Sequence, residues 1–397
     1  MDLTGKTIVI GVTGSIAAYK MADLTSRLVK QGCNVHVIMT KNAANFIHPI
    51  TFETLTSHKC LIDTFDRNFE FQVEHISLAK QADVMLIAPA SANVIGKMAN
   101  GIADDMLTTT YLAMKCPILV APAMNTRMFE NSIVQDNIEK LRKYGCQMIS
   151  PASGHLACGD TGSGKLADLD TIYAHLEYAL TDKKDLSGKN ILVTAGPTQE
   201  ALDPVRYLTN HSSGKMGYAI AKAAANRGAN VTLISGQTVL DTPLFVKKVP
   251  VVSAEDMYQA VKEQIAGQDI VVMSAAVADY RPSQYMSEKI KKKDEDMSIP
   301  LERTTDILGY LGSLDKKPFL CGFAMETEHL LERAKQKLMK KHLNMIVANN
   351  LKDTGAGFQG DTNKITIVTK DVEKSLPIMS KEDVAGEILD AIVEMGE

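Results

Sequence analysis

Three segments in the first half of the chain place glycine, serine or asparagine directly after an apolar run, where such residues could bind a ligand. The segments are Gly11–Ser15, Ala88–Asn93 and Ala121–Asn125. Glycine lets a backbone approach a ligand closely, and a helix that begins at such a turn offers N–H groups to a phosphate. Each segment by itself is equally well explained as an ordinary turn before a capped helix. If the three loops meet at one edge of a sheet, they form a crevice for a planar cofactor with a phosphate tail.

Two further residues of the first half are candidates for moving protons. Cys158 lies in the glycine-rich segment Gly154–Lys165, which favours a flexible flap. A thiol with an ordinary pKa of roughly 8.5 is mostly protonated at neutral pH and can donate a proton. The alternative is a surface loop whose cysteine is incidental. His75 is a candidate base, although a single histidine is more often structural or exposed.

The second half contains three candidate ligand-binding segments. Asn210–Gly217 combines hydroxyls, glycine and lysine at a helix start, which is the composition of an anion cradle and equally that of a capped helix. Asp279 follows a predicted strand, and its carboxylate can hold Mg2+ or a sugar hydroxyl. Lys289 lies in a lysine-rich part of Tyr280–Pro300. Such a run is usually a solvated face, and the sharper hypothesis is a mobile loop that closes over a triphosphate.

Alternating strands and helices are needed to position these residues. Near-continuous apolar runs predict parallel strands that helices cover on both faces. The predicted strands are Thr7–Val12, Val35–Met39, Val84–Ala88, Ile118–Ala121, Ile191–Ala195, Val231–Ser235, Ile270–Ala275, Phe319–Phe323 and Met345–Ala348. The predicted helices are Ile16–Lys30, Asn93–Met98, Ala103–Met114, Ser132–Tyr144, Lys215–Arg227, Ala254–Ala266, Glu328–Lys341 and Lys381–Met395. The pattern predicts an α/β protein with two doubly wound, Rossmann-like domains, the first flavodoxin-like with a largely parallel sheet.

A domain boundary is expected near residues 181–189. The turn sequences Asp2–Lys6 and Asp185–Lys189 both precede a predicted strand, and the stretch before the second is polar. The match is too short to prove duplication, because two similar strand openings explain it as well. We expect domains at 1–188 and 189–397.

Composition excludes several classes of protein. Acidic residues (47) outnumber Lys and Arg (43) among the 397 residues, which argues against a general nucleic-acid binder. Apolar runs such as Ile270–Ala278 are far shorter than the ~20 residues that span a bilayer, and we expect neither a membrane span nor a signal peptide. Six cysteines without CxxC spacing predict reduced thiols and a cytoplasmic protein. The missing GxGxxG fingerprint argues against a nicotinamide dehydrogenase.

Taken together, these segments resemble the flavin-dependent cysteine decarboxylases. The resemblance is carried by Gly11–Lys20, Pro89–Asn93, Pro122–Asn125 and the segment around Cys158. Over essentially the whole chain, the sequence resembles the bacterial bifunctional phosphopantothenoylcysteine decarboxylase / phosphopantothenate–cysteine ligase family of coenzyme A biosynthesis. One departure is Phe129, which stands where the family usually has Trp and loses an indole N–H donor.

For the first half, the resemblance implies FMN as cofactor. Gly14 and Ser15 would lie near its phosphate, and Ser91 and Asn93 near the flavin ring. The implied reaction removes CO2 from a cysteine amide. The flavin oxidises the thiol end to a thioaldehyde, so that the electrons left by CO2 are delocalised, and later returns the electrons.

The resemblance also implies roles for the candidate proton-transfer groups. His75 would be the active-site base or orienting group, and Asn125 would bind the substrate carboxylate. Cys158 would protonate the product of decarboxylation.

For the second half, the resemblance implies a CTP- and Mg2+-dependent ligase. Asn210 would stabilise an acyl-cytidylate, Arg206 would bind that intermediate or phosphopantothenate, and Lys289 would be the catalytic lysine. Asp279 would also hold Mg2+. The residues that match CTP-contacting positions are Ala275, Asp279, Lys289, Thr305, Asp306, Ile307, Leu308, Phe323, Lys337 and Lys341.

Some of these assignments have plainer explanations or depart from the family. Lys337 and Lys341 are four residues apart on one helix face, where surface solubility explains them as well. Asn344 and Asn350 stand where the family often has Asp.

The implied ligase reaction joins 4′-phosphopantothenate to cysteine. The carboxylate attacks the α-phosphorus of CTP and releases pyrophosphate, and the cysteine amine then displaces CMP. The product is the substrate of the decarboxylase. The resemblance implies a homo-oligomer with trimeric decarboxylase domains and dimeric ligase domains, for example a dodecamer. An FMN-binding regulatory subunit and a nicotinamide dehydrogenase remain the alternatives.

Overall fold

The computed structural model describes residues 3–65, 74–155, 159, 161–292, 297–326, 329–350 and 360–396. The chain divides into two compact units, Met1–Asp182 and Lys183–Glu397, which are described separately. Among the described residues, no helix is both long and apolar enough to cross a bilayer.

A parallel sheet forms the centre of the first unit. Its strands are β1 (Thr7–Val12), β2 (Asn34–Met39), β3 (Val84–Ala90), β4 (Ile118–Pro122) and β5 (Gln147–Met148). In the described residues they form a five-stranded sheet in the order β2-β1-β3-β4-β5, and every neighbouring pair is parallel. This is the flavodoxin-like strand order, so the predicted α/β fold is confirmed. The order reverses between β1 and β3, where doubly wound sheets bind their ligands.

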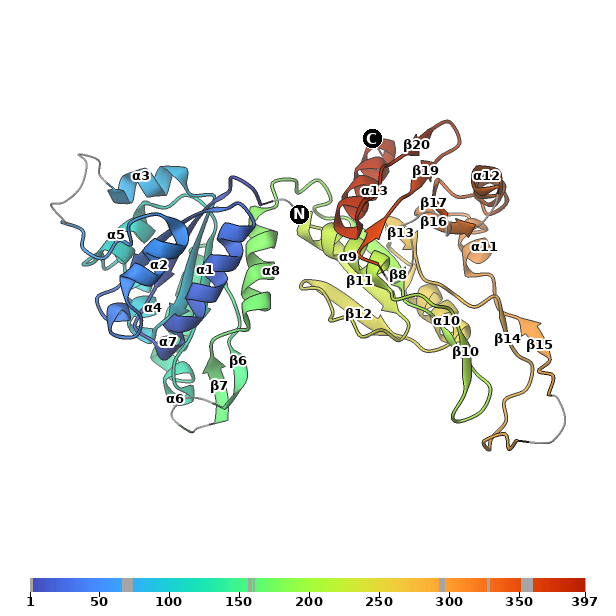
Figure 1. Ribbon diagram of the computed structural model, residues 1–397, viewed down its shortest axis with the longest axis horizontal. Helices are drawn as coiled ribbons and strands as arrows, with labels where there is room; N and C mark the ends of the chain where they lie inside the picture. Colours follow the sequence, from blue (N-terminus) through green and yellow to red (C-terminus); the bar gives the residue numbers. More distant parts are fainter. Residues whose placement is uncertain are drawn as a thin grey trace. The chain divides into compact units, whose positions relative to one another are not determined.

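Helices cover both faces of this sheet (Figure 1). One face packs against η1 (Ile16–Tyr19), α1 (Lys20–Lys30), α2 (Pro49–Thr56) and α8 (Leu169–Leu180). The other packs against α3 (Glu74–Gln81), α4 (Ala92–Ala99), α5 (Met106–Ala113) and α7 (Ser132–Lys143). The short helices η2 (Ala43–Asn45) and α6 (Thr126–Phe129) lie in connections.

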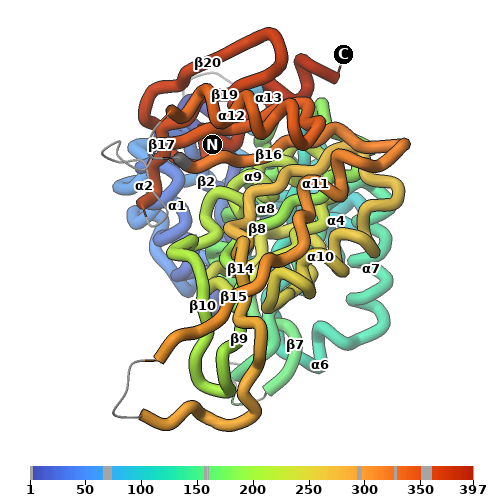
Figure 2. The backbone as a smooth tube through the Cα atoms, turned by 90° about the vertical axis from the view of Figure 1, so that its right-hand side faces the viewer, coloured from blue at the N-terminus to red at the C-terminus, as the bar shows by residue number. Residues whose placement is uncertain are grey.

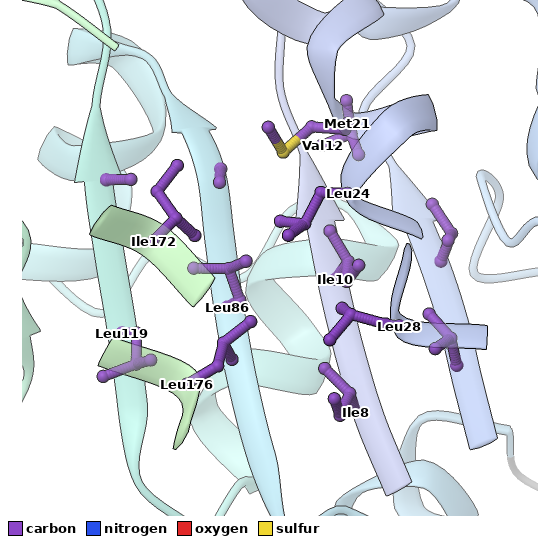
Figure 3. Packing of buried hydrophobic residues seen from close by; sticks show 14 of the residues in the cluster. Ile8, Ile10, Val12, Met21, Leu24, Leu28, Leu86, Leu119, Ile172 and Leu176 are labelled. Atoms are coloured by element: carbon purple, nitrogen blue, oxygen red, sulfur yellow. The ribbon is translucent and has the colours of Figure 1, made fainter. Parts of the chain in front are cut away.

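Strand and helix periodicities meet in the core of the first unit. Ile8, Ile10 and Val12 alternate along β1, while Met21, Leu24 and Leu28 recur along α1, as Figure 3 shows. All six are fully buried. Truncating one such leucine to alanine costs about 2–5 kcal/mol of folding free energy, so this layer holds β1 and the loop after it in place.

The second unit is also built on a doubly wound sheet. Its strands are β8 (Asn190–Ala195), β11 (Asn230–Ser235), β12 (Val246–Pro250), β13 (Ile270–Met273), β16 (Phe319–Glu326), β17 (Met345–Asn350), β19 (Thr366–Val368) and β20 (Glu373–Ser375). In the described residues they form an eight-stranded sheet in the order β12-β11-β8-β13-β16-β17-β19-β20. The first six strands are parallel and follow the Rossmann order, with the reversal between β8 and β13.

Helices again form a layer on each face of the second sheet. α9 (Lys215–Asn226) and α13 (Lys381–Gly396) cover one face. α10 (Ala254–Gln264), α11 (Ile307–Gly312) and α12 (Leu330–Lys340) cover the other. Residue Glu328, where a helix was predicted to begin, lies outside the described residues.

Small antiparallel ribbons extend from the sheets. They are β6 (Ala152–His155) with β7 (Thr161–Lys165), β9 (Gln199–Ala201) with β10 (Tyr207–Thr209), β14 (Tyr280–Pro282) with β15 (Leu301–Arg303), and β18 (Thr362–Asn363) with β21 (Met379–Ser380). The prediction of a loop over Tyr280–Pro300 is wrong at its start, because Tyr280–Pro282 pairs with Leu301–Arg303. The β9–β10 and β14–β15 ribbons lie side by side (Figure 2) and are joined by a hydrogen bond from Met286 N–H to the Leu202 carbonyl of 3.1 Å.

Candidate functional sites

A large cavity of about 1380 Å³ opens at the carboxyl ends of β1, β3 and β4. The three loops singled out in the sequence all line it, and they bring together Gly14, Ser15, Ser91, Asn93 and Asn125. The cavity lies beside the reversal of strand order between β1 and β3. Its position is therefore the one that doubly wound sheets use for ligands.

Three of these polar residues are helix N-caps. Ser15 Oγ accepts from Ala17 N–H at 3.4 Å, and Ser91 Oγ accepts from Val94 N–H at 3.4 Å. Asn125 Oδ1 accepts from Arg127 N–H at 2.8 Å. Capping and ligand binding are compatible here, because the caps place three helix starts at one cavity.

Thr13 joins two of the loops and was missed by the sequence reasoning. It is fully buried, and its hydroxyl donates to the Pro89 carbonyl at 2.6 Å and accepts from Ser91 N–H at 2.9 Å. The peptide bond between Ala88 and Pro89 is cis. A threonine in a glycine-rich turn directly after a buried strand was the available signal.

The cavity has the features that a flavin nucleotide requires. A Cβ on Gly14 would lie 2.8 Å from Asn42 Cβ, so the turn tolerates no side chain and its backbone forms the cavity wall. Met124 and Met128 supply apolar wall, and Lys97 lies at the edge, where it pairs with Asp104 and Asp105. The hydrogen bond to Asp104 raises the pKa of Lys97, which keeps it charged. The donor set fits a planar ring with a phosphate tail.

Two predicted site residues of the first half, His75 and Cys158, are not among the described residues that line this cavity. His75 lies half-buried on α3, and within the described part of the chain it is not among the residues that line this cavity. Cys158 lies outside the described residues. The β6–β7 ribbon on either side of it does reach the cavity, through His155, Gly164 and Lys165. His155 was not singled out in the sequence.

The second unit has two neighbouring cavities, of about 460 and 150 Å³, at the carboxyl ends of β13 and β16. Ala275 and Phe323 line both. The larger cavity collects most of the predicted nucleotide-binding residues. These are Ala275, Asp279, Thr305, Asp306, Ile307, Leu308, Phe323, Lys337 and Lys341.

Local contacts hold the wall of the larger cavity in place. Asp306 caps α11 by accepting from Gly309 N–H at 2.9 Å, and its carboxylate also pairs with Lys341. Lys337 Nζ donates to the Phe323 carbonyl at 2.7 Å. Two lysines from α12 and its C-cap therefore reach the edge of the cavity, which suits a ligand with several negative charges.

The smaller cavity lies at the N-terminus of α9. It is lined by Ser212, Ser213 and Lys215, as expected for the segment Asn210–Gly217. It also includes Lys381, which is 6% exposed and donates to the Gly360 carbonyl at 2.6 Å. Burial lowers the pKa of Lys381. Lys381 belongs to a helix more than a hundred residues away in sequence, so local spacing carried no signal for it.

Three predicted ligase residues are not among the described residues that line the two cavities. Asn210 Nδ2 donates to the Ala276 carbonyl at 3.0 Å, at the rim of the smaller cavity. Arg206 pairs with Asp203 at 2.6 Å. Lys289 is exposed, and neither cavity includes Arg206 or Lys289 among its described lining residues.

The departures from the family pattern have structural explanations where they are described. Asn344 Oδ1 accepts from Leu320 N–H at 2.9 Å, which joins β16 to the turn before β17. Phe129 packs against the core cluster of α4, α5 and α7. Among the described residues, no group of three or more His, Cys, Asp or Glu side chains could hold a metal ion by itself.

Two family models match the chain. The model described as Flavoprotein matches residues 1–180, and the model described as DNA/pantothenate metabolism flavoprotein C-terminal domain matches residues 186–395. Among solved structures, the C-terminal domain of a coenzyme A biosynthesis bifunctional protein CoaBC is 47% identical and covers 54% of this chain and 98% of its own, with a TM-score of 0.47. The FMN-dependent cysteine decarboxylase SpaF is 32% identical and covers 43% and 94%, with a TM-score of 0.39.

Similarity to curated relatives extends over the whole chain. The coenzyme A biosynthesis bifunctional protein CoaBC of Bacillus subtilis is 47% identical over 399 residues, which are 100% of this chain and 98% of that protein. The CoaBC of Escherichia coli is 43% identical and covers 99% and 98%. Full-length identity at this level, together with both family models, shows that the chain belongs to the CoaBC family of bifunctional coenzyme A biosynthesis proteins.

Proposed function

We propose that the two halves divide the activities of the family between them. Residues 1–188 hold FMN and decarboxylate phosphopantothenoylcysteine, and residues 189–397 use CTP to join 4′-phosphopantothenate to cysteine. Family membership makes the chain a bifunctional enzyme of coenzyme A biosynthesis with decarboxylase and ligase activities. The observation that carries the division is that each sheet has its own polar cavities near its reversal of strand order.

In the first half, the roles follow the walls of the large cavity. The turn at Gly14 and Ser15 would hold the FMN phosphate, and Ser91 and Asn93 would contact the ring. When bound, FMN supplies reversible two-electron oxidation of the substrate thiol. Asn125 would orient the substrate carboxylate, since its Oδ1 is engaged by the cap and an amide NH2 is suited to donate to a carboxylate.

Proton transfer is assigned to residues outside the described cavity wall. Cys158 would donate the proton that replaces CO2. His75 would act as base or orienting group in the cavity of a second copy, because its own chain does not place it at the described wall. A homo-oligomer with trimeric decarboxylase domains would provide this arrangement, and dimeric ligase domains would complete the assembly. A thiol donor needs a reducing compartment, so we place the protein in the cytoplasm.

In the second half, CTP would occupy the larger cavity. Lys337, Lys341 and Lys289 would offset the negative charge that builds up on the triphosphate as the carboxylate attacks. Asn210 and Arg206 would bind the acyl-cytidylate. Mg2+ would bind mainly through the phosphates, with Asp279 as a protein carboxylate ligand, which is a common arrangement for this ion.

The test uses purified full-length protein with 4′-phosphopantothenate, cysteine, Mg2+ and either CTP or ATP. Pyrophosphate and CO2 are followed separately. We expect both products with CTP and yellow protein from bound flavin. Pyrophosphate without CO2 would contradict the roles given to the first cavity. Folded yellow protein that releases neither product would overturn the proposal and favour an FMN-binding regulator.

A further inference from the structure

A buried carboxylate, Asp203, lies in the turn between β9 and β10. The residue is 2% exposed. Its Oδ1 accepts from the backbone N–H groups of Val205 and Arg206, both at 2.8 Å. Its Oδ2 accepts from Arg206 Nε at 3.0 Å, Arg206 Nη2 at 2.6 Å and Ile290 N–H at 3.1 Å. Burial alone would raise the pKa of Asp203, but these hydrogen bonds hold the pKa well below its usual value.

The Asp203–Arg206 ion pair also binds the backbone next to Lys289. Ile290, the next residue, donates its N–H to Asp203 and accepts from Arg206 Nη2 at 2.6 Å through its carbonyl. Both backbone polar groups of Ile290 are therefore bound to one charged pair, in which Asp203 is buried and Arg206 is exposed. A third hydrogen bond, from Met286 N–H to the Leu202 carbonyl, joins the β9–β10 turn to the segment before Lys289. Lys289 itself is exposed, so its place depends on the backbone beside it.

We propose that Asp203 is a positioning residue for Lys289 in the ligase reaction. The proposal rests on the function proposed above, in which Lys289 acts on the triphosphate. Asp203 does not line either described cavity, so it acts through the segment that it holds. A lysine on a free loop samples many positions, and misplacing a catalytic group by about 1 Å can cost a factor of 100 in rate. Fixing Ile290 limits where the neighbouring ammonium group can reach.

The variant Asp203→Asn distinguishes the positioning of Lys289 from simple support of the β9–β10 turn. The amide oxygen can still accept from Val205 and Arg206 N–H groups, which preserves the turn. Its NH2 group then stands where Oδ2 stood and meets the donors of Arg206 and Ile290. Asp203→Asn therefore removes the hydrogen bonds that Oδ2 accepts from Arg206 and Ile290, while the shape of the side chain is unchanged.

The experiment measures CTP-dependent pyrophosphate release by the full-length, FMN-loaded protein. Asp203→Asn should lower kcat by about 10- to 100-fold with KM for cysteine unchanged, since charge-assisted hydrogen bonds to the loop are lost. Lys289→Gln should also lower kcat. The double variant should be no slower than Lys289→Gln alone, because Asp203 has nothing left to position. Multiplicative losses in the double variant would show that Asp203 acts independently of Lys289, through Arg206 or the turn, and would overturn the proposal.

Controls separate this proposal from the function on which it rests. Full ligase activity of Lys289→Gln would refute the role of Lys289, and the proposal for Asp203 with it. A slow Lys289→Gln beside a fully active Asp203→Asn would refute only the role of Asp203. Glu302→Gln breaks an exposed ion pair with Arg281, 2.8 Å long, on the neighbouring β14–β15 ribbon and should change kcat less than about twofold. CO2 release from supplied phosphopantothenoylcysteine should be unchanged in every variant.

A second variant keeps the test decisive if Asp203→Asn does not fold. Ile290→Pro removes the N–H that Asp203 accepts and leaves the ion pair and the β9–β10 turn in place. It should reproduce the loss of kcat. Normal pyrophosphate release by Ile290→Pro would overturn the proposal.

Discussion

Thr13 shows how a single hydroxyl organises the large cavity. Its two hydrogen bonds connect the loop after β1 to the loop after β3. Thr13→Val keeps the shape but leaves the buried Pro89 carbonyl and Ser91 N–H without this partner. We expect a loss of about 1–3 kcal/mol in the free energy of unfolding and weaker retention of FMN. Urea unfolding and flavin absorbance after gel filtration measure both. Thr13→Ser keeps the hydroxyl and should behave like the wild type; equal loss in both variants would contradict this account.

His36 makes the first unit sensitive to acid. Its ring stacks on His58 with centroids 4.2 Å apart. Burial, and then the charge of His58, lower the pKa of His36 from 6.5 to about 4. The folded state therefore favours neutral His36, and the resulting stability is complete above pH 6.5 and is lost as the pH falls towards 4.

The expected signature is the uptake of up to about one proton on unfolding between pH 6.5 and 4. Urea midpoints across this range measure it. His36→Phe, which cannot take up a proton, should flatten the pH dependence. An unchanged slope in the variant would show that other groups are responsible.

At the scale of elements, the approach of α9 to β8 is set by Gly217. A Cβ there would lie 2.5 Å from Ala195 Cβ and 2.9 Å from the Thr194 carbonyl oxygen. Gly217→Ala should therefore push the helix start away from the sheet and lower the free energy of unfolding by about 1–3 kcal/mol. Because α9 begins at the smaller cavity, which shares Ala275 and Phe323 with the proposed CTP cavity, KM for CTP should rise as well, which steady-state pyrophosphate assays would detect.

Gly386 in α13 is the matched control for this helix glycine. No atom lies within 4 Å of the position that its Cβ would take. Gly386→Ala should raise the free energy of unfolding by about 0.5–1 kcal/mol, because alanine loses less backbone entropy in a helix. If thermal melts show the same sign for both alanine variants, close packing at Gly217 is not what determines the effect.

At the scale of the whole molecule, two units with separate cores and separate cavities should respond to ligands separately. We expect calorimetry of the full-length protein to show two unfolding transitions. CTP with Mg2+ at about 100 times its Kd should stabilise one of them by about 2.7 kcal/mol and leave the other unchanged. Removal of FMN should lower the midpoint temperature of only the transition that CTP leaves unchanged. A single transition that both ligands shift equally would contradict independent units.

Much of the fold could be predicted because it depends on local patterns. β1 has the predicted bounds, Thr7–Val12, and the other predicted strands of the sheets differ from the observed ones only at their ends. Buried parallel strands are short apolar runs, and such runs are visible without an alignment. The sequence patterns do not predict α8 (Leu169–Leu180). They also predict a loop at β14, because a three-residue strand is defined by its partner rather than by its own residues.

The sequence by itself determined the two α/β units and the loops that line the large cavity. The reason is physical: the carboxyl ends of parallel strands meet at one edge, so residues that follow different strands converge without any knowledge of the strand order. Gly14, Ser91 and Asn125 came together in this way.

Only the tertiary structure decided which distant groups pair. Lys381 reaches the smaller cavity from the last helix, and Asp203 meets Ile290 across 87 positions of the sequence. The structure also left His75 and Lys289 outside the described cavity walls. Contacts of this kind depend on how separate loops pack and on the burial of charge, and neither leaves a period or a spacing in the chain.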